Sequence, residues 1–84
     1  MEQYRQEVLL TNLEARRREV MDYAINIENF QLAIQQIEND PDAAEFKARL
    51  EQLLTEHIRE HKKASIMLNV LEEQCKNFPQ PQIT

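Results

Sequence analysis

The chain of 84 residues contains no glycine. Glycine most readily takes a positive φ, so its absence argues against tight β-hairpins, β-bulges and glycine-rich phosphate-binding loops. About six glycines would be expected at the usual frequency of roughly 7%. Of the three prolines, only Pro41 lies between two long stretches with helical patterns, since Pro79 and Pro81 come near the C-terminus. The composition therefore predicts a chain that is almost wholly helical, with one break.

Cysteine and long apolar runs are also scarce. Cys75 is the only cysteine, which excludes an internal disulfide framework and favours a reducing, cytoplasmic setting. No apolar run approaches the ~18 residues of a membrane span, so no membrane partner is expected. The chain has no Cys-x-x-Cys pair and no glycine-rich loop or strand–turn–helix site for a nucleophile. We therefore expect a protein that is not an enzyme and needs no cofactor.

Charge is present but unevenly spread, within a formal net charge of −5. Residues 22–56 contain eight acids and two bases, a net charge of −6, whereas residues 1–21 balance at zero and residues 57–84 have +1. If the chain folds back at Pro41, the turn end is strongly acidic. Such an end could attract a basic partner or repel nucleic acid, or it could simply keep the protein in solution.

Apolar residues between Leu9 and Ile37 repeat every seven residues in two adjacent rows. Such rows are the a and d positions of a heptad, and they predict a long amphipathic helix of the coiled-coil type. Only Arg16 interrupts them, and the bulky Tyr23 and Phe30 favour a core wider than that of two strands. The first row is Leu13, Val20, Ile27 and Ile34, and the second is Leu9, Tyr23, Phe30 and Ile37.

The run Asn39-Asp40-Pro41-Asp42 predicts the turn. Asp40 can cap a new helix, and proline suits the first helical position because its missing N–H is not needed there. A second amphipathic helix follows, whose central row is Leu50, His57, Ala64, Leu71 and Phe78. One side of this row is flanked by Phe46, Leu53 and Met67, and the other by Leu54, Leu68 and Cys75.

These patterns predict an all-α fold, a long antiparallel helical hairpin over residues 1–78. Its helices are expected at about 3–38 and 41–77, with a turn at 39–41, and a flexible tail at 79–84. Two helices side by side each bury one narrow strip and leave apolar flanks in water. Pairing of two hairpins into a four-helix bundle would cover those flanks, so a homodimer is expected.

One short motif resembles a catalytic site. His57-Ile58-Arg59-Glu60-His61 matches the H-x-x-E-H signature of inverted zinc proteases, with both histidines on one helix face. The resemblance implies zinc bound by His57 and His61. It covers only five residues, however, and zinc needs a third protein ligand and a closed second shell. His57 and His61 are therefore a weak metal candidate, and we expect neither metal nor proteolysis.

A structural role for these residues is the stronger hypothesis. In a hairpin that turns near residue 40, facing positions sum to about 80, so Arg16 lies within a turn of Glu60 and His61. We expect a polar layer of Arg16, His57, Glu60 and His61 between the helices. Such layers fix register and orientation at some cost in stability.

Six basic residues are predicted to meet midway along the hairpin. We name them the basic collar: Arg16, Arg17, Arg18, Arg59, Lys62 and Lys63. The collar could contact phosphates, but no aromatic stacking platform lies beside it and several glutamates dilute it. A solvated helix face is the preferred interpretation.

Taken together, the sequence predicts a small, acidic, cytoplasmic module for protein–protein interaction. It would act as an adaptor, regulator or inhibitor of a larger protein, and would pair with itself. Two alternatives remain open. One is a small nucleic-acid-associated regulator that uses the basic collar, and the other is a subunit of a larger coiled-coil assembly.

Overall fold

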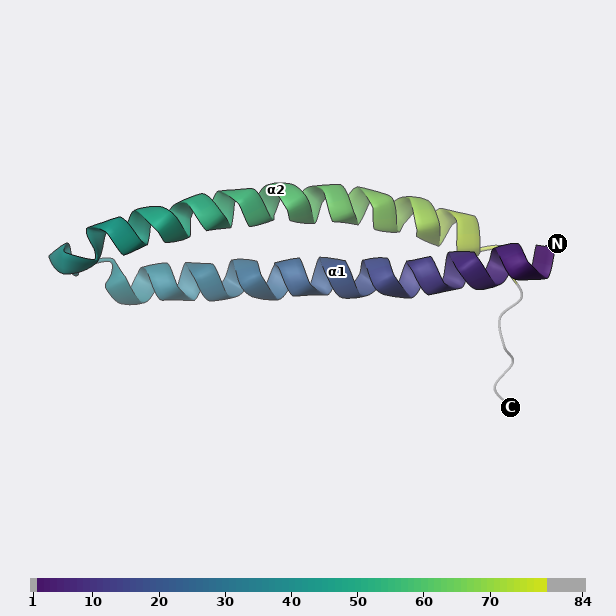
Figure 1. The fold of residues 1–84 in the computed structure, drawn as a ribbon, viewed down its shortest axis with the longest axis horizontal. Helices are drawn as coiled ribbons and strands as arrows, with labels where there is room; N and C mark the ends of the chain where they lie inside the picture. Colours follow the sequence, from purple (N-terminus) through teal and green to yellow (C-terminus); the bar gives the residue numbers. More distant parts are fainter. Residues whose placement is uncertain (1, 79–84) are drawn as a thin grey trace, which may run out of the picture.

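The computed structural model describes residues 2–78, and it is a hairpin of two long helices (Figure 1). Helix α1 spans Glu2–Ile37, the short 3-10 helix η1 spans Pro41–Ala43, and helix α2 spans Ala44–Cys75. The two long helices lie side by side and antiparallel, so both ends of the described chain meet at the end opposite the turn. The molecule is a rod 60 Å long. The prediction of an all-α helical hairpin is confirmed.

The turn is made without any left-handed residue, because no described residue has a positive φ. Helix α1 ends at Ile37, whose carbonyl accepts a hydrogen bond from the amide of Asp40 at 3.1 Å. Asp40 is extended, with φ −96° and ψ 107°, and its Oδ1 accepts from the amide of Asp42 at 2.9 Å. Asp40 thus caps η1 and Pro41 occupies its first turn, as a chain without glycine requires.

The helix boundaries differ from the predicted ones at the turn. Pro41 begins η1, and helix α2 starts only at Ala44. A tight 3-10 turn at a helix N-terminus accounts for this difference, since it places proline where no amide donor is needed. At the other end α2 stops at Cys75, and the amide of Phe78 donates to the carbonyl of Cys75 at 3.1 Å. The predicted tail at 79–84 lies outside the described residues.

The core is one strip between α1 and α2. Its best-packed part lies towards the open end, where Leu13, Leu71 and Cys75 are buried and the half-buried Leu9 and Phe78 pack against them. None of the twelve apolar residues predicted for the interface between the helices is exposed. Three are buried (Leu13, Leu50, Leu71) and nine are half-buried (Leu9, Val20, Tyr23, Ile27, Phe30, Ile34, Ile37, Leu54, Leu68).

The two sides of the central apolar row of α2 differ in solvent exposure. On one side Leu54 and Leu68 are half-buried and Cys75 is buried. On the other side Phe46 is 56% exposed and Met67 is 43% exposed, whereas Leu53 between them is half-buried. The Cys75 side of α2 is thus covered along its length, and the other side is covered only around Leu53.

Within residues 2–75, neither of the long helices contains a stretch apolar enough to cross a membrane.

We expect Leu13→Ala to lower the free energy of unfolding by about 2–4 kcal/mol, because it removes a side chain that is 6% exposed and leaves a cavity. Leu10→Ala is the matched control, since Leu10 lies on the same helix but is 47% exposed. It should stay within about 0.5 kcal/mol of the parent chain. Urea unfolding followed by circular dichroism measures both, and equal losses would show that the core strip is wrongly placed.

Candidate functional site

The middle of the rod holds a cluster of rings between the helices. The ring of His57 meets those of Tyr23 and Phe30 edge-on, with ring centroids 5.7 and 4.9 Å apart. Helix α2 bows away from the straighter α1 along its middle (Figure 1). Edge-to-face contacts of this kind add stability beyond area burial.

The ring of His57 is also held by its own helix, because its Nδ1 lies 2.8 Å from the carbonyl oxygen of Leu53. With a proton on Nδ1 the ring donates to this carbonyl, which leaves Nε2 as the free nitrogen. His61 is half-buried one turn further along α2. Within residues 2–78, no three histidine, cysteine, aspartate or glutamate side chains gather in a way that could hold a metal ion. The pair therefore finds no third ligand of the kind that zinc needs.

The four residues of the predicted polar layer, Arg16, His57, Glu60 and His61, are all half-buried, but the ion pairs of Arg16 and Glu60 do not link the two helices. Nη1 of Arg16 lies 2.9 Å from Oε1 of Glu19, and Nζ of Lys63 lies 3.2 Å from Oε1 of Glu60. Both pairs run along a single helix, at a spacing of three residues. Each of these charged groups therefore has its ion-pair partner one turn away on its own helix.

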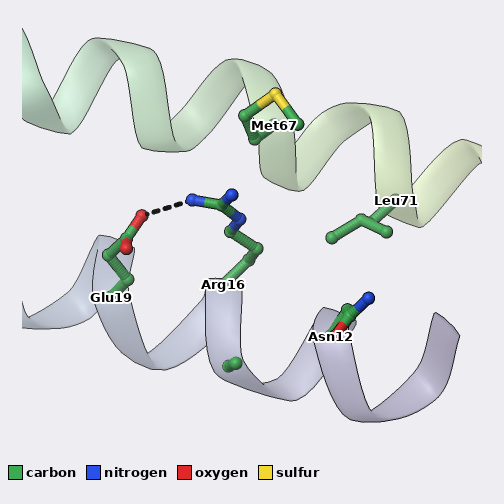
Figure 2. A pocket seen from close by; sticks show the side chains of 6 residues that line it. Asn12, Arg16, Glu19, Met67 and Leu71 are labelled. Carbon is green, nitrogen blue, oxygen red and sulfur yellow. Dashed lines mark hydrogen bonds and ion pairs between the residues drawn. The ribbon is translucent and has the colours of Figure 1, made fainter. Parts of the chain in front are cut away.

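Arg16 also lies at a different level from the predicted one. It lines a hollow of about 410 Å³ together with Met67 and Leu71 of α2, and not with Glu60 and His61. Figure 2 shows the guanidinium of Arg16 between the two helices and turned towards Glu19, with Met67 and Leu71 approaching from the opposite ribbon. The facing positions at this end of the rod therefore sum to more than the predicted 80.

Two further hollows lie next to this one along α1. A second hollow of about 280 Å³ shares Asn12 with it and extends to Tyr4 and Val8. A third, of about 370 Å³, shares Ala15 and Glu19 with it and extends to Asn26. Both of these hollows are lined by residues of α1 alone, so only the first lies between the two helices. On α2, Ile66 is 54% exposed and Val70 is 48% exposed.

The basic collar does not form a single positive surface. Arg18 shares a hollow with Glu19 and Asp22, and Arg17 shares another with Glu72 and Lys76. Arg16 and Lys63 are paired with glutamates, as described above. Arg59 and Lys62 are exposed on α2. Acids thus lie among the bases around most of the collar, and they weaken any attraction for phosphate.

The acidic turn end carries an apolar residue that the sequence pattern assigned to the flank of the core. Phe46 lies in the first turn of α2, next to Glu45 and one turn beyond Asp42, and all three are exposed. Glu38 and Asp40 in the turn are exposed as well. The heptad position of Phe46 predicted a flank and could not reveal its exposure, because that depends on how the first turn of α2 packs against α1.

No protein-family model, curated protein or solved structure significantly matches this chain.

For the histidines we expect a structural effect and no response to zinc. His57→Ala removes the ring that meets Tyr23 and Phe30, and should lower the free energy of unfolding by about 1–3 kcal/mol, whereas His57→Phe should retain most of it. One equivalent of zinc should leave the melting temperature of the parent chain unchanged within a degree or two. A zinc-dependent rise of ten degrees or more that is lost in His57→Ala would instead establish a metal site.

Proposed function

We propose that this chain is a non-enzymatic helical module for protein–protein interaction, a small adaptor, regulator or inhibitor that binds a larger protein and pairs with a second copy of itself. Its setting is a reducing one such as the cytoplasm, where the buried thiol of Cys75 stays free. The observation that carries the proposal is the exposed Phe46 among acids at the turn end.

An exposed phenylalanine surrounded by acids suits recognition of a protein. Aromatic residues are enriched where binding energy concentrates, because a rigid ring buries much apolar area when it fills a pocket. The surrounding carboxylates of Glu38, Asp42 and Glu45 would steer a basic partner towards the ring and orient it. The complementary surface on the partner is therefore an apolar pocket rimmed by lysine or arginine.

The shape of the molecule supports the same function. The chain exposes 6867 Å², whereas a compact monomer of 10.0 kDa is expected to expose about 5,200 Å². The hollows of residues 2–78 lie open on the sides of a thin rod and give no enclosed space for a small substrate. A rod of this kind offers large side surfaces and two distinct ends, which suits binding to other macromolecules.

The experiment is affinity capture with the full chain as bait, followed by quantitative mass spectrometry. We expect a protein that is retained in proportion to the bait, and we expect Phe46→Ala to reduce its retention at least tenfold, because the anchoring ring is lost. Tyr4→Ala is the control, since Tyr4 is an exposed aromatic residue at the opposite end of the rod. Equal retention by the parent chain and Phe46→Ala would contradict a role for the turn end.

Charge at the turn end should act mainly on the rate of association. With the captured protein purified, reversal of charge at Asp42 and Glu45 to lysine should slow association and flatten its dependence on salt, while the dissociation rate changes little. Stopped-flow or surface-binding kinetics at several salt concentrations give both rates. An unchanged association rate would show that the acids do not face the partner.

In contrast to protein binding, we do not expect this chain to bind nucleic acid. Because acids lie among the bases of the collar, we expect no binding of duplex DNA or RNA at physiological salt, as measured by fluorescence anisotropy. Sub-micromolar binding would favour the nucleic-acid alternative. In that event, loss of Arg17 or Lys63 should lower the slope of log affinity against log salt by about 0.9 per lost phosphate contact on DNA.

A further inference from the structure

We propose that the half of the rod next to the turn imitates one strand of nucleic acid and occupies a groove for single-stranded nucleic acid on the larger partner. We call this part of the chain, residues 22–56, the acidic half. The inference rests on the proposed binding of a partner at the turn end, and it adds the class of that partner. The chain then acts as an inhibitor, because it and nucleic acid compete for one groove.

The charge of the acidic half is not neutralised within the chain. All of its eight acids are exposed, and the four ion pairs found among residues 2–78 all lie outside it. Of its two bases, Arg49 donates to Oε1 of Gln52 at 3.2 Å and not to a carboxylate. The acids are Asp22, Glu28, Glu38, Asp40, Asp42, Glu45, Glu51 and Glu56. Their charge therefore faces solvent and selects a basic partner.

The linear density of this charge is close to that of one strand of nucleic acid. The part of α1 from Asp22 to Ile37 is sixteen residues long, or ~24 Å at 1.5 Å per residue. A net charge of −6 over this length is one charge per ~4 Å. B-form DNA has one phosphate per ~3.4 Å along each strand, and one per ~1.7 Å when both strands are counted. The acidic half thus matches a single strand of about seven nucleotides and has less than half the charge density of a duplex.

Phe46 supplies the counterpart of a base. Grooves for single strands combine basic residues along the backbone with aromatic side chains on which the bases stack. The ring of Phe46 is 56% exposed, and the exposed acids Asp42 and Glu45 lie one turn before it and next to it on the chain. An aromatic ring thus lies beside negative groups, as a base lies beside its phosphates. A groove built for bases and phosphates offers contacts to both.

The charge pattern sets how far the rod enters the groove. The basic collar lies directly beyond the acidic half, and a basic surface repels its exposed Arg59 and Lys62. Residues 1–21 balance at zero and residues 57–84 have +1, so the open half offers no excess of negative charge. The rod therefore enters with its turn end first, over the length at which its charge resembles that of a nucleic-acid strand.

A competition experiment with the captured and purified partner tests the inference. The partner is mixed with a fluorescent oligothymidylate of about 30 nucleotides, which is long enough for the ~4–16 nucleotides that one such binding fold covers. We expect the partner to bind the oligonucleotide and the full chain to displace it, so that the fluorescence anisotropy falls to that of the free oligonucleotide. The same titration with oligouridylate shows whether the groove takes DNA or RNA.

Two competitors separate imitation of a strand from attraction by charge alone. Polyglutamate at the same concentration of charge should displace the oligonucleotide at least tenfold less well than the chain does, because it has carboxylates but no ring. Phe46→Ala, which keeps every charge of the chain, should likewise need at least a tenfold higher concentration for half displacement than the parent chain.

Two double variants with the same change in net charge test the length of the contact. Glu28→Gln with Glu56→Gln removes charge from the end of the acidic half remote from the turn, since Glu56 lies ~15 Å from Phe46 along α2. It should raise the concentration for half displacement at least fivefold. Glu7→Gln with Glu14→Gln, at exposed positions of the open half, is the matched control and should change that concentration less than twofold.

The outcomes separate this inference from the proposed function. If the chain captures no protein, both are contradicted. A captured protein that binds no oligonucleotide, or binds it together with the chain, would retain the proposed function and overturn the imitation of a strand. Equal effects of the two double variants would overturn it as well, because the contact would then be confined to Phe46 and the acids around it. Displacement by polyglutamate as efficient as that by the chain would show attraction by charge alone, with the same consequence.

Discussion

A hairpin of two helices gives each helix only one neighbour, and this constraint accounts for most of the structure. Each helix can bury one strip of side chains, so only five apolar residues of the described chain are buried, and none of them completely. The apolar side chains beside that strip remain partly exposed to water. In a larger bundle a helix with apolar residues on several sides would have several neighbours, and here those sides remain as exposed surface.

The same constraint places the polar groups. A charged side chain near the strip can reach solvent or a neighbour on its own helix more easily than a partner across the interface. Arg16 pairs with Glu19, and Lys63 with Glu60, for this reason. Exposed pairs of this kind contribute about 0–1 kcal/mol each, so they do not decide the register. The register is set by packing, in the strip around Leu13 and Leu71 and in the ring cluster around His57.

The sequence was sufficient for the helices, the turn and the strip. Heptad rows place Leu13, Leu50 and Leu71 inside, and Asp40-Pro41 ends one helix and starts the next by local chemistry alone. The exposure of Phe46 and Met67 could not be predicted in this way, because they are as apolar as Leu54 and Leu68 on the other flank. Packing against α1 decides between them. The partner of Arg16 could not be predicted either, since Glu19 on its own helix competes with every residue opposite.

The exposed flank links the architecture to the proposed function. Met67 lines an open hollow between the helices in the open half, and Phe46 on the same flank lies at the acidic turn. In the proposed homodimer each copy presents a turn end of its own. A partner with two equivalent sites, or two partners at once, could then be bound with gains in avidity.

The central claim is that a single hairpin is incomplete and that a second copy completes it. The most direct measurement is the melting temperature of the parent chain over a hundredfold range of protein concentration. If folding is coupled to pairing, mass action should raise the melting temperature by about 4 °C for each tenfold increase in concentration. A melting temperature that does not change with concentration, at a mass of one chain, would contradict the account.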